Sequence, residues 1–277
     1  MTTPVESVIE GTGDDTVTIT SNTPLYFPLD IAKVEAKFKG KKHVVFVDDY
    51  NKPIGYNIFP EGIESIKFGT DFNQRIGNPT TQELQSIYPG VDIKGMKLFP
   101  DSLKKLVFGF SFNNRDTHFD PKIFPANLEE LDLGEYYGVI NSGVLPANLK
   151  KLKFGYRFNN HPRPEISNPL TAEVIPRGLT HLEFGQSFTN GDKQFNSNVL
   201  PKTLEFLNLG SYNNGNNPLK PGDLPPHLKT LSFGNTHFTN NGQPLKVYNL
   251  IENLIPRSIT QELVLGPYIY FIDLKNE

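Results

Sequence analysis

The chain has 277 residues and a formal net charge of −3, with 23 Gly, 23 Pro, 21 Phe and 27 Asn but neither Cys nor Trp. The lack of Cys excludes a disulfide framework, a thiolate metal site and a cysteine nucleophile. The near-zero charge disfavours a nucleic-acid partner, which would require a basic surface, and no apolar run reaches the roughly 18 residues of a membrane-spanning helix.

The N-terminal segment, residues 1–37, is predicted to be a β cap on the part of the chain that follows. Residues 17–20 and 34–38 alternate apolar and polar side chains, as half-buried strands do, so they are expected to cover the first edge strand. The first 20 residues hold four acidic residues, no basic residue and no apolar run, which predicts that no secretory signal is present.

Residues 38–266 hold nine copies of one pattern, P-x-x-L-x-x-L-x-[FL]-G. The first copy is degenerate and begins at Phe38, and successive copies start 22, 40, 25, 21, 30, 25, 24 and 31 residues apart. Self-similarity at such a period is typical of solenoids. The basic unit is therefore a coil of 21–25 residues, with insertions in three coils. The other copies begin at Pro60, Pro100, Pro125, Pro146, Pro176, Pro201, Pro225 and Pro256.

Each coil is predicted to contain one short strand. In the copy that begins at Pro100, Leu106 and Phe108 are two residues apart and so face the same side of a strand. Gly109 would then end the strand and free the chain to turn, and the aromatic Phe112 would fold back under the sheet. Because a residue before Pro favours extended backbone, the return arms are expected to be extended. The predicted fold is a mostly β solenoid of about nine coils with one parallel sheet.

The insertions and the C-terminus are predicted to differ from the coils. Residues 80–83, followed by Leu84 and Ile87, have the signature of a helix capping box, and residues 246–254 are a second candidate for a turn of helix. Residues 267–277 are expected to form a C-terminal cap, in which residues 268–272 cover the last coil.

The phrase Leu-Pro-x-x-Leu-x-x-Leu-x-Phe-Gly-x-x-Phe-Asn-x-x-Ile, repeated over about residues 38–266, resembles the FNIP repeat, a divergent relative of leucine-rich repeats. The resemblance implies a leucine-rich-repeat-like, right-handed solenoid with a parallel sheet on the concave side and extended arms on the convex side. Such repeats occur chiefly in social amoebae and in giant viruses that infect amoebae, often behind an F-box, and are regarded as protein-interaction arrays. The segment before the first coil is short and reads as β, so no F-box is expected here.

On each strand, the residues that alternate with the core positions are expected to form an open face of the sheet. Opposite charges at equivalent positions would lie on adjacent strands and pair, which gives either a self-neutralising surface or a partner-binding mosaic. The first column of equivalent positions is Lys42, Glu64, Lys104, Glu129, Lys150, Thr180, Glu205 and Lys229. The second column is His43, Ser65, Lys105, Glu130, Lys151, His181, Phe206 and Thr230, and the third is Val45, Lys67, Val107, Asp132, Lys153, Glu183, Asn208 and Ser232. The candidate partner-binding residues are Lys67, Lys105, Glu130, Asp132, Lys151, Lys153, His181, Glu183, Phe206 and Asn208.

Two further features have alternative interpretations. Phe206 is an aromatic residue on an otherwise polar face, and it would either anchor a partner or contact neighbouring side chains. An Asn follows the downstream aromatic in five coils, and it would either bind a glycan or, as we expect, satisfy backbone groups of adjacent coils where the chain turns. This predicted turn ladder is Asn51, Asn73, Asn113, Asn159 and Asn213.

These observations predict a non-enzymatic protein-interaction module that uses no cofactor. The sequence has no Walker-type phosphate loop, no G-x-S-x-G elbow and no H-E-x-x-H motif, and its six scattered His residues predict no metal site. The lack of Cys and of any N-x-[ST] acceptor favours an intracellular location, in a cytoplasm or a virion. The expected partner is a protein, without nucleic acid or membrane, and the chain is expected to be a monomer. The alternative is a structural or virion-associated protein that self-assembles.

Overall fold

The structure of the chain is a computed structural model. It describes residues 14–23, 25, 36–77, 82, 85–86, 90, 95–158, 170–186, 188, 195–210, 212, 219–233, 239–240, 243–244, 255–259, 262–265 and 268–270.

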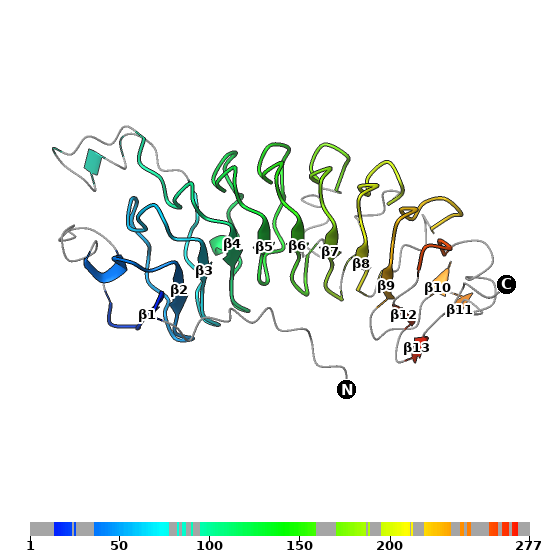
Figure 1. Cartoon of the computed structure of the whole chain (residues 1–277), viewed down its shortest axis with the longest axis horizontal. Helices are drawn as coiled ribbons and strands as arrows, with labels where there is room; N and C mark the ends of the chain where they lie inside the picture. Colours follow the sequence, from blue (N-terminus) through cyan, green and yellow to red (C-terminus); the bar gives the residue numbers. More distant parts are fainter. Residues whose placement is uncertain are drawn as a thin grey trace.

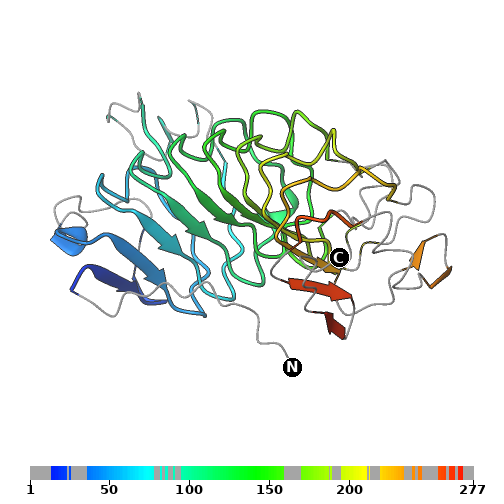
Figure 2. The same cartoon turned by 45° about the vertical axis from the view of Figure 1, so that its right-hand side comes forward.

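One sheet of 11 strands runs through these residues, and its spatial order is the chain order. Strands β1 to β9 and β12 pair in parallel, and only β13 is antiparallel, to β12. Figure 1 shows the strands in one row bent into an arch, and Figure 2 shows them side by side like the rungs of a ladder. The strands are β1 (Thr16–Ile19), β2 (His43–Phe46), β3 (Ser65–Lys67), β4 (Lys105–Val107), β5 (Glu130–Asp132), β6 (Lys151–Lys153), β7 (His181–Glu183), β8 (Phe206–Asn208), β9 (Thr230–Phe233), β12 (Glu262–Leu265) and β13 (Tyr268–Tyr270).

Each of the nine sequence copies contributes one strand, from β2 to β12, so the predicted mostly β solenoid with one parallel sheet is confirmed. The register is the one that aligning the copies predicts: Ser65 pairs with Lys105, Lys105 with Glu130, and Glu130 with Lys151. The other described elements are the antiparallel pair β10 (Thr239–Asn240) and β11 (Gln243–Pro244) and the 3-10 turn η1 (Asn114–Asp116). The described residues contain no helix that is long and apolar enough to cross a membrane.

The core lies on one side of this sheet, under the strands. On each strand from β3 to β9, the residue equivalent to Leu106 is buried, and so is the Phe or Leu two positions later. Aromatic rings stack from coil to coil: Phe68 and Phe108 lie 5.3 Å apart between ring centroids with planes 3° apart, and Phe72 and Phe112 are 6.1 Å apart with planes 11° apart. The downstream aromatic therefore folds under the sheet as predicted, and the stack ties neighbouring coils such as those of β3 and β4 together.

The glycines that follow β3 to β8 are needed for a reason that the sequence analysis did not identify. At Gly69, Gly109, Gly155 and Gly185 the backbone has an ordinary φ, so a turn does not require glycine there. A Cβ on Gly155 would instead lie 1.7 Å from the carbonyl oxygen of Gly134, and one on Gly109 would lie 1.9 Å from that of Gly69. Glycine is needed because consecutive coils approach each other too closely for a side chain.

The caps agree with the sequence analysis in part. Strand β1 pairs with β2, and β13 pairs with β12, so strands cover both ends of the repeat array as expected. The expectation of a strand over residues 34–38 is wrong at residues 36–38, which are helical. Residues 82, 85 and 86 are helical, as the capping box predicts. The second predicted helical turn, at residues 246–254, lies outside the described residues.

Candidate binding face

The open face of the sheet consists of the three columns defined above. The second and third columns lie on the strands, on the side opposite the core, and the first lies just before the strands begin. On β5, β6, β7 and β8 the central residue is buried and both flanking residues stay partly or fully exposed. Alternation along each strand therefore places the polar side chains in columns that cross the sheet. Ser65, Val107 and Thr230 are exceptions, since they are buried although they belong to these columns.

Lateral ion pairs link the charged residues of this face. In the second column, the Glu130 carboxylate lies between the ammonium groups of Lys105, at 2.9 Å, and Lys151, at 2.8 Å. In the third column, Lys153 lies 3.0 Å from Asp132. Burial would raise the pKa of Glu130, but hydrogen bonds from Lys151 and Lys105 outweigh it and leave the pKa below its usual value. The alternating signs thus form real pairs, and the face is largely self-neutralising.

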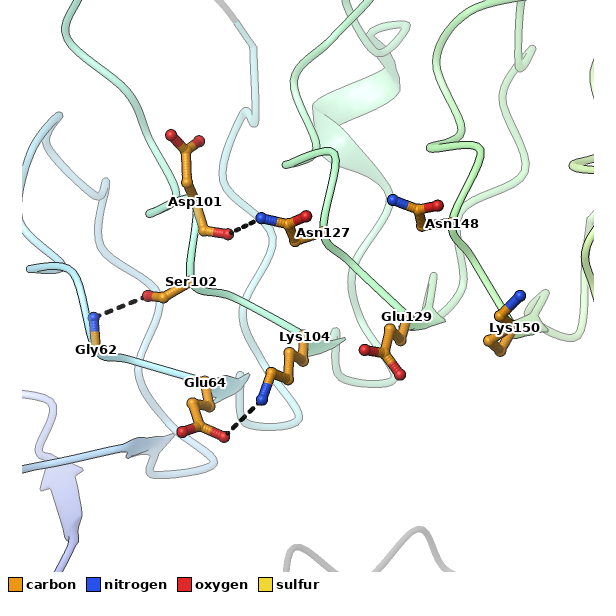
Figure 3. Close-up of a pocket in the computed structure, with 9 residues that line it drawn as sticks. All are labelled: Gly62, Glu64, Asp101, Ser102, Lys104, Asn127, Glu129, Asn148 and Lys150. Carbon is orange, nitrogen blue, oxygen red and sulfur yellow. Dashed lines mark hydrogen bonds and ion pairs between the residues drawn. The ribbon is translucent and has the colours of Figure 1, made fainter.

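A polar groove runs along the first column, at the edge where the strands begin. Its cavity volume is about 510 Å³. Figure 3 shows the Lys104 ammonium pointing toward Glu64, at 3.3 Å, and away from Glu129. Glu64 also forms an ion pair with Lys42, at 3.5 Å. Among the described residues, neither Glu129 nor Lys150 takes part in an ion pair. The lining residues are Gly62, Glu64, Asp101, Ser102, Lys104, Asn127, Glu129, Asn148 and Lys150.

Asparagine and serine side chains hold the wall of this groove in place. Asn127 donates to the carbonyl of Asp101 at 3.0 Å, and Ser102 Oγ accepts from the backbone N–H of Gly62 at 2.9 Å. Asn148 donates to the carbonyl of Ala126 at 3.0 Å. Because these bonds cross between coils, the groove has a fixed backbone on which Glu129 and Lys150 present opposite charges. Sequence reasoning placed both residues in a column but did not select them.

Phe206 packs against a neighbouring side chain on the face. Its ring stacks on that of His181 with a centroid distance of 5.6 Å and planes 16° apart. Burial, assisted by Lys151, lowers the pKa of His181 although Glu205 and Glu130 act in the opposite sense, and Thr180 Oγ1 lies 2.9 Å from Nδ1 of the same ring. The simpler of the two sequence interpretations, contact with a neighbour, therefore holds. Both rings nonetheless remain partly exposed.

Three candidate residues of the third column have differing surroundings. Burial raises the pKa of the Glu183 carboxyl, and Lys153 opposes the rise. Asn208 Oδ1 accepts the backbone N–H of Gly210 at 2.9 Å, so part of its role is to hold the end of its own strand. Lys67 is exposed, at the end of β3, and pairs with Val107 of β4.

The turn ladder has the hydrogen bonds that its structural interpretation requires. Asn51 Oδ1 accepts the backbone N–H of Asn73 at 3.0 Å, and Asn73 Oδ1 accepts that of Asn113 at 2.9 Å. Asn113 Oδ1 then accepts the backbone N–H of Tyr137 at 3.2 Å. Each side-chain amide accepts a backbone N–H of the next coil, so these side chains link neighbouring coils. Asn159 and Asn213 lie outside the described residues.

A second surface, on the loops just after the strands, escaped sequence reasoning. Phe110 and Tyr156 are the large hydrophobic residues that stay exposed in the described part of the chain, at 71% and 49% of their surface. Each immediately follows the glycine of its coil, a position at which other coils carry Thr70 or Gln186. An aromatic residue at a position that is polar elsewhere was the available signal. Within the described residues, no group of His, Asp and Glu is arranged to hold a metal ion.

Two kinds of comparison with known proteins give matches. The family profile of the FNIP repeat matches residues 50–78 and 167–212. Among solved structures, the chain resembles CroV588, a giant-virus protein described as having a novel circular LRR structure, with 29% identity and a TM-score of 0.56. The match covers 80% of the present chain and 30% of that chain, so the present chain spans about a third of that protein. A search of curated proteins found no match.

Proposed function

The chain belongs to the FNIP-repeat proteins, which are leucine-rich-repeat-like, and from this premise we propose that it is a non-enzymatic module that binds a protein partner through its open face. The observation that carries the proposal is the sheet face itself, which stays partly exposed over consecutive strands from β5 to β8. Solenoids bind partners on extended surfaces of this kind. This step from fold to binding rests on the architecture of the solenoid.

The charges of the face suit recognition more than non-specific attraction. Pairs such as Glu130 with Lys105 and Lys151 neutralise one another, so the face has no large field of one sign. Glu129 and Lys150 present two adjacent opposite charges in the groove. A partner with the reversed order of charges would gain on binding, and one in the wrong register would be repelled. The His181–Phe206 ring pair supplies apolar area beside them.

The perturbed titratable groups support a non-enzymatic role. The shifts at Glu130 and Lys153 arise within the lateral ion pairs. Ion-pair networks shift pKa values without catalysis. The absence of Cys and of N-linked glycan acceptors supports a location inside a cell or a virion.

The test is affinity capture with the full chain as bait, followed by mass spectrometry and variants of the face. Phe206→Ala removes the ring that stacks on His181. The double variant Glu129→Lys/Lys150→Glu reverses the groove charges while the net charge stays the same and no recorded ion pair is broken. Lys202→Glu, on an exposed turn outside the face, is the matched control. The proposal predicts a partner that the control retains and both face variants lose, with unchanged melting temperatures. Equal recovery by all variants would show that binding occurs elsewhere or not at all.

Self-assembly is a second candidate function, and one observation favours it. The solved relative is described as circular, and the present chain matches 30% of its length. A segment of that size would complete such a ring only together with other copies. Sedimentation across a hundredfold concentration range separates the candidates, because an interaction module with capped ends stays monomeric and a ring-former does not.

A further inference from the structure

A row of three residues lies on the loops after the strands, away from the open face. Phe110 follows β4, Glu135 follows β5 and Tyr156 follows β6, each one position after the glycine that ends its strand. Because β4, β5 and β6 are consecutive in the sheet, the carboxylate belongs to the coil between the two aromatic coils. All three line one cavity of about 520 Å³, together with Ser111, Asn113, Tyr137 and Arg157.

The spacing of the coils suits a cation between the two rings. Neighbouring strands of a sheet are about 4.8 Å apart, so positions two strands apart are separated by about 10 Å. If the two rings extend side by side from these positions, a cation midway between them would be about 5 Å from each, and cation–π attraction acts within about 6 Å of the ring centroid. Glu135 Oε1 accepts the backbone N–H of Tyr156 at 2.9 Å. This bond fixes the carboxylate against the coil of Tyr156 and leaves acceptor sites for an incoming donor.

The surrounding charges leave Glu135 incompletely neutralised. Burial raises the pKa of Glu135, and it outweighs the backbone hydrogen bonds from Tyr156 and Arg157 and the charge of Arg157. Asp132 adds a second negative charge nearby, while Lys153 adds a positive one that already pairs with Asp132. A carboxylate that is half desolvated and still charged gains from a further cation, and aromatic walls favour a weakly hydrated one.

We propose that the Phe110–Glu135–Tyr156 cleft binds a basic side chain, Lys or Arg, of a protein partner. The proposal shares with the proposed function only the assumption that the occupant is part of a protein. It uses a different surface from the open face, so either proposal can fail without the other. The guanidinium of Arg fits best, because it is planar, stacks on aromatic faces and donates to a carboxylate.

A short peptide tests this directly. The probe is acetyl-Gly-Gly-Arg-Gly-Gly-amide, titrated into the ¹⁵N-labelled chain and followed by chemical shifts; the same peptide with Lys, and with neutral citrulline in place of Arg, completes the set. We expect millimolar binding of the Arg and Lys peptides, shifts centred on Glu135 and Arg157, and at least threefold weaker binding of the citrulline peptide. No binding of the basic peptides at 10 mM, or equal binding of citrulline, overturns the proposal.

Variants separate cation–π binding from non-specific apolar contact. Phe110→Leu keeps apolar bulk but removes the aromatic face, and Glu135→Gln removes the charge; each should weaken the Arg peptide about two- to fivefold. Tyr156→Phe keeps the ring and should bind like the parent chain. Full affinity in Phe110→Leu would mean that the cleft is merely apolar and would refute the inference. Melting curves confirm that each variant is folded.

The pH dependence gives a readout that a structural role would not move. Binding of a cation stabilises charged Glu135, so affinity should fall as the pH drops through the raised pKa of this group, and Glu135→Gln should abolish that fall. Asp132, Lys153 and Arg157 face the same carboxylate and are unchanged in the variant. Peptide binding should be intact in Phe206→Ala, so failure here and failure of the open-face proposal are distinguishable.

Discussion

Replacing Gly155 by Ala should destabilise the solenoid more than a similar change at a surface turn. Gly155 has an ordinary φ, so an Ala there meets no backbone penalty. The added Cβ, however, would lie 1.7 Å from the carbonyl oxygen of Gly134, where ordinary contacts begin at 3.4 Å. The coils of β5 and β6 would have to move apart at this point. All of the expected effect is therefore steric.

The magnitude follows from what the separation would stretch. Forcing an extra carbon into a packed interior costs about 1–3 kcal/mol. The bonds from Leu133 N to the Lys153 carbonyl, at 3.0 Å, and from Tyr156 N to Glu135 Oε1, at 2.9 Å, join these two coils beside the site, and each is worth about 1 kcal/mol. We expect a loss of about 3–5 kcal/mol in the free energy of unfolding, which corresponds to a fall in Tm of roughly 10 °C for a chain of this size.

Gly143→Ala is the matched control. Gly143 has a φ of 83°, and a Cβ there would have no heavy atom within 4 Å. Its cost should be only the left-handed backbone penalty of about 1 kcal/mol. Both variants are measured by urea unfolding and by thermal melts followed by circular dichroism. If Gly143→Ala proves the more damaging, glycine is needed for its backbone freedom and the close-approach explanation fails.

Three further predictions concern the ladders. Asn73→Ala should cost about 1–2 kcal/mol in urea unfolding because it leaves the backbone N–H of Asn113 without its acceptor, whereas Asn148→Ala, which exposes only a solvated carbonyl, should stay within about 0.5 kcal/mol. Glu130→Gln should lower Tm slightly at pH 7; because the pKa of Glu130 is depressed on folding, the difference should vanish as the pH falls through that lowered pKa. Glu183→Gln should raise Tm at pH 7, since burial raises the pKa of Glu183 and its charge opposes folding; the gain should disappear below the ordinary pKa of 4.5, and a lower Tm at pH 7 would contradict this reasoning.

The repeat pattern determined the fold because each coil repeats the same local physics. Leu106 and Phe108 are buried as their spacing predicts, and the register of β3 to β8 is that of the aligned copies. The pattern did not predict which neighbouring carboxylate a given lysine would pair with. Lys104 has Glu64 before it and Glu129 after it in the first column, and a single ammonium on a flexible stem selects one of them. Alternation predicts that pairs form, but it does not say which carboxylate is left in the groove.

The coils of β5 and β8 have a different turn after the strand, and the sequence shows this difference. The turn after β5 shapes the proposed cleft. Where Leu133 and Leu209 replace the usual Phe, the preceding residues are Asp132 and Asn208, and their side chains accept the N–H of a following glycine whose φ is 57°. A short polar side chain followed by a left-handed glycine is a turn that other residues do not favour. In the coil of β5 this turn redirects the chain just before Glu135. The carboxylate is therefore half-buried, while Phe110 and Tyr156, which follow glycines of ordinary φ, extend into solvent on either side. The same substitution that interrupts the aromatic stack thus places a charge between two exposed rings.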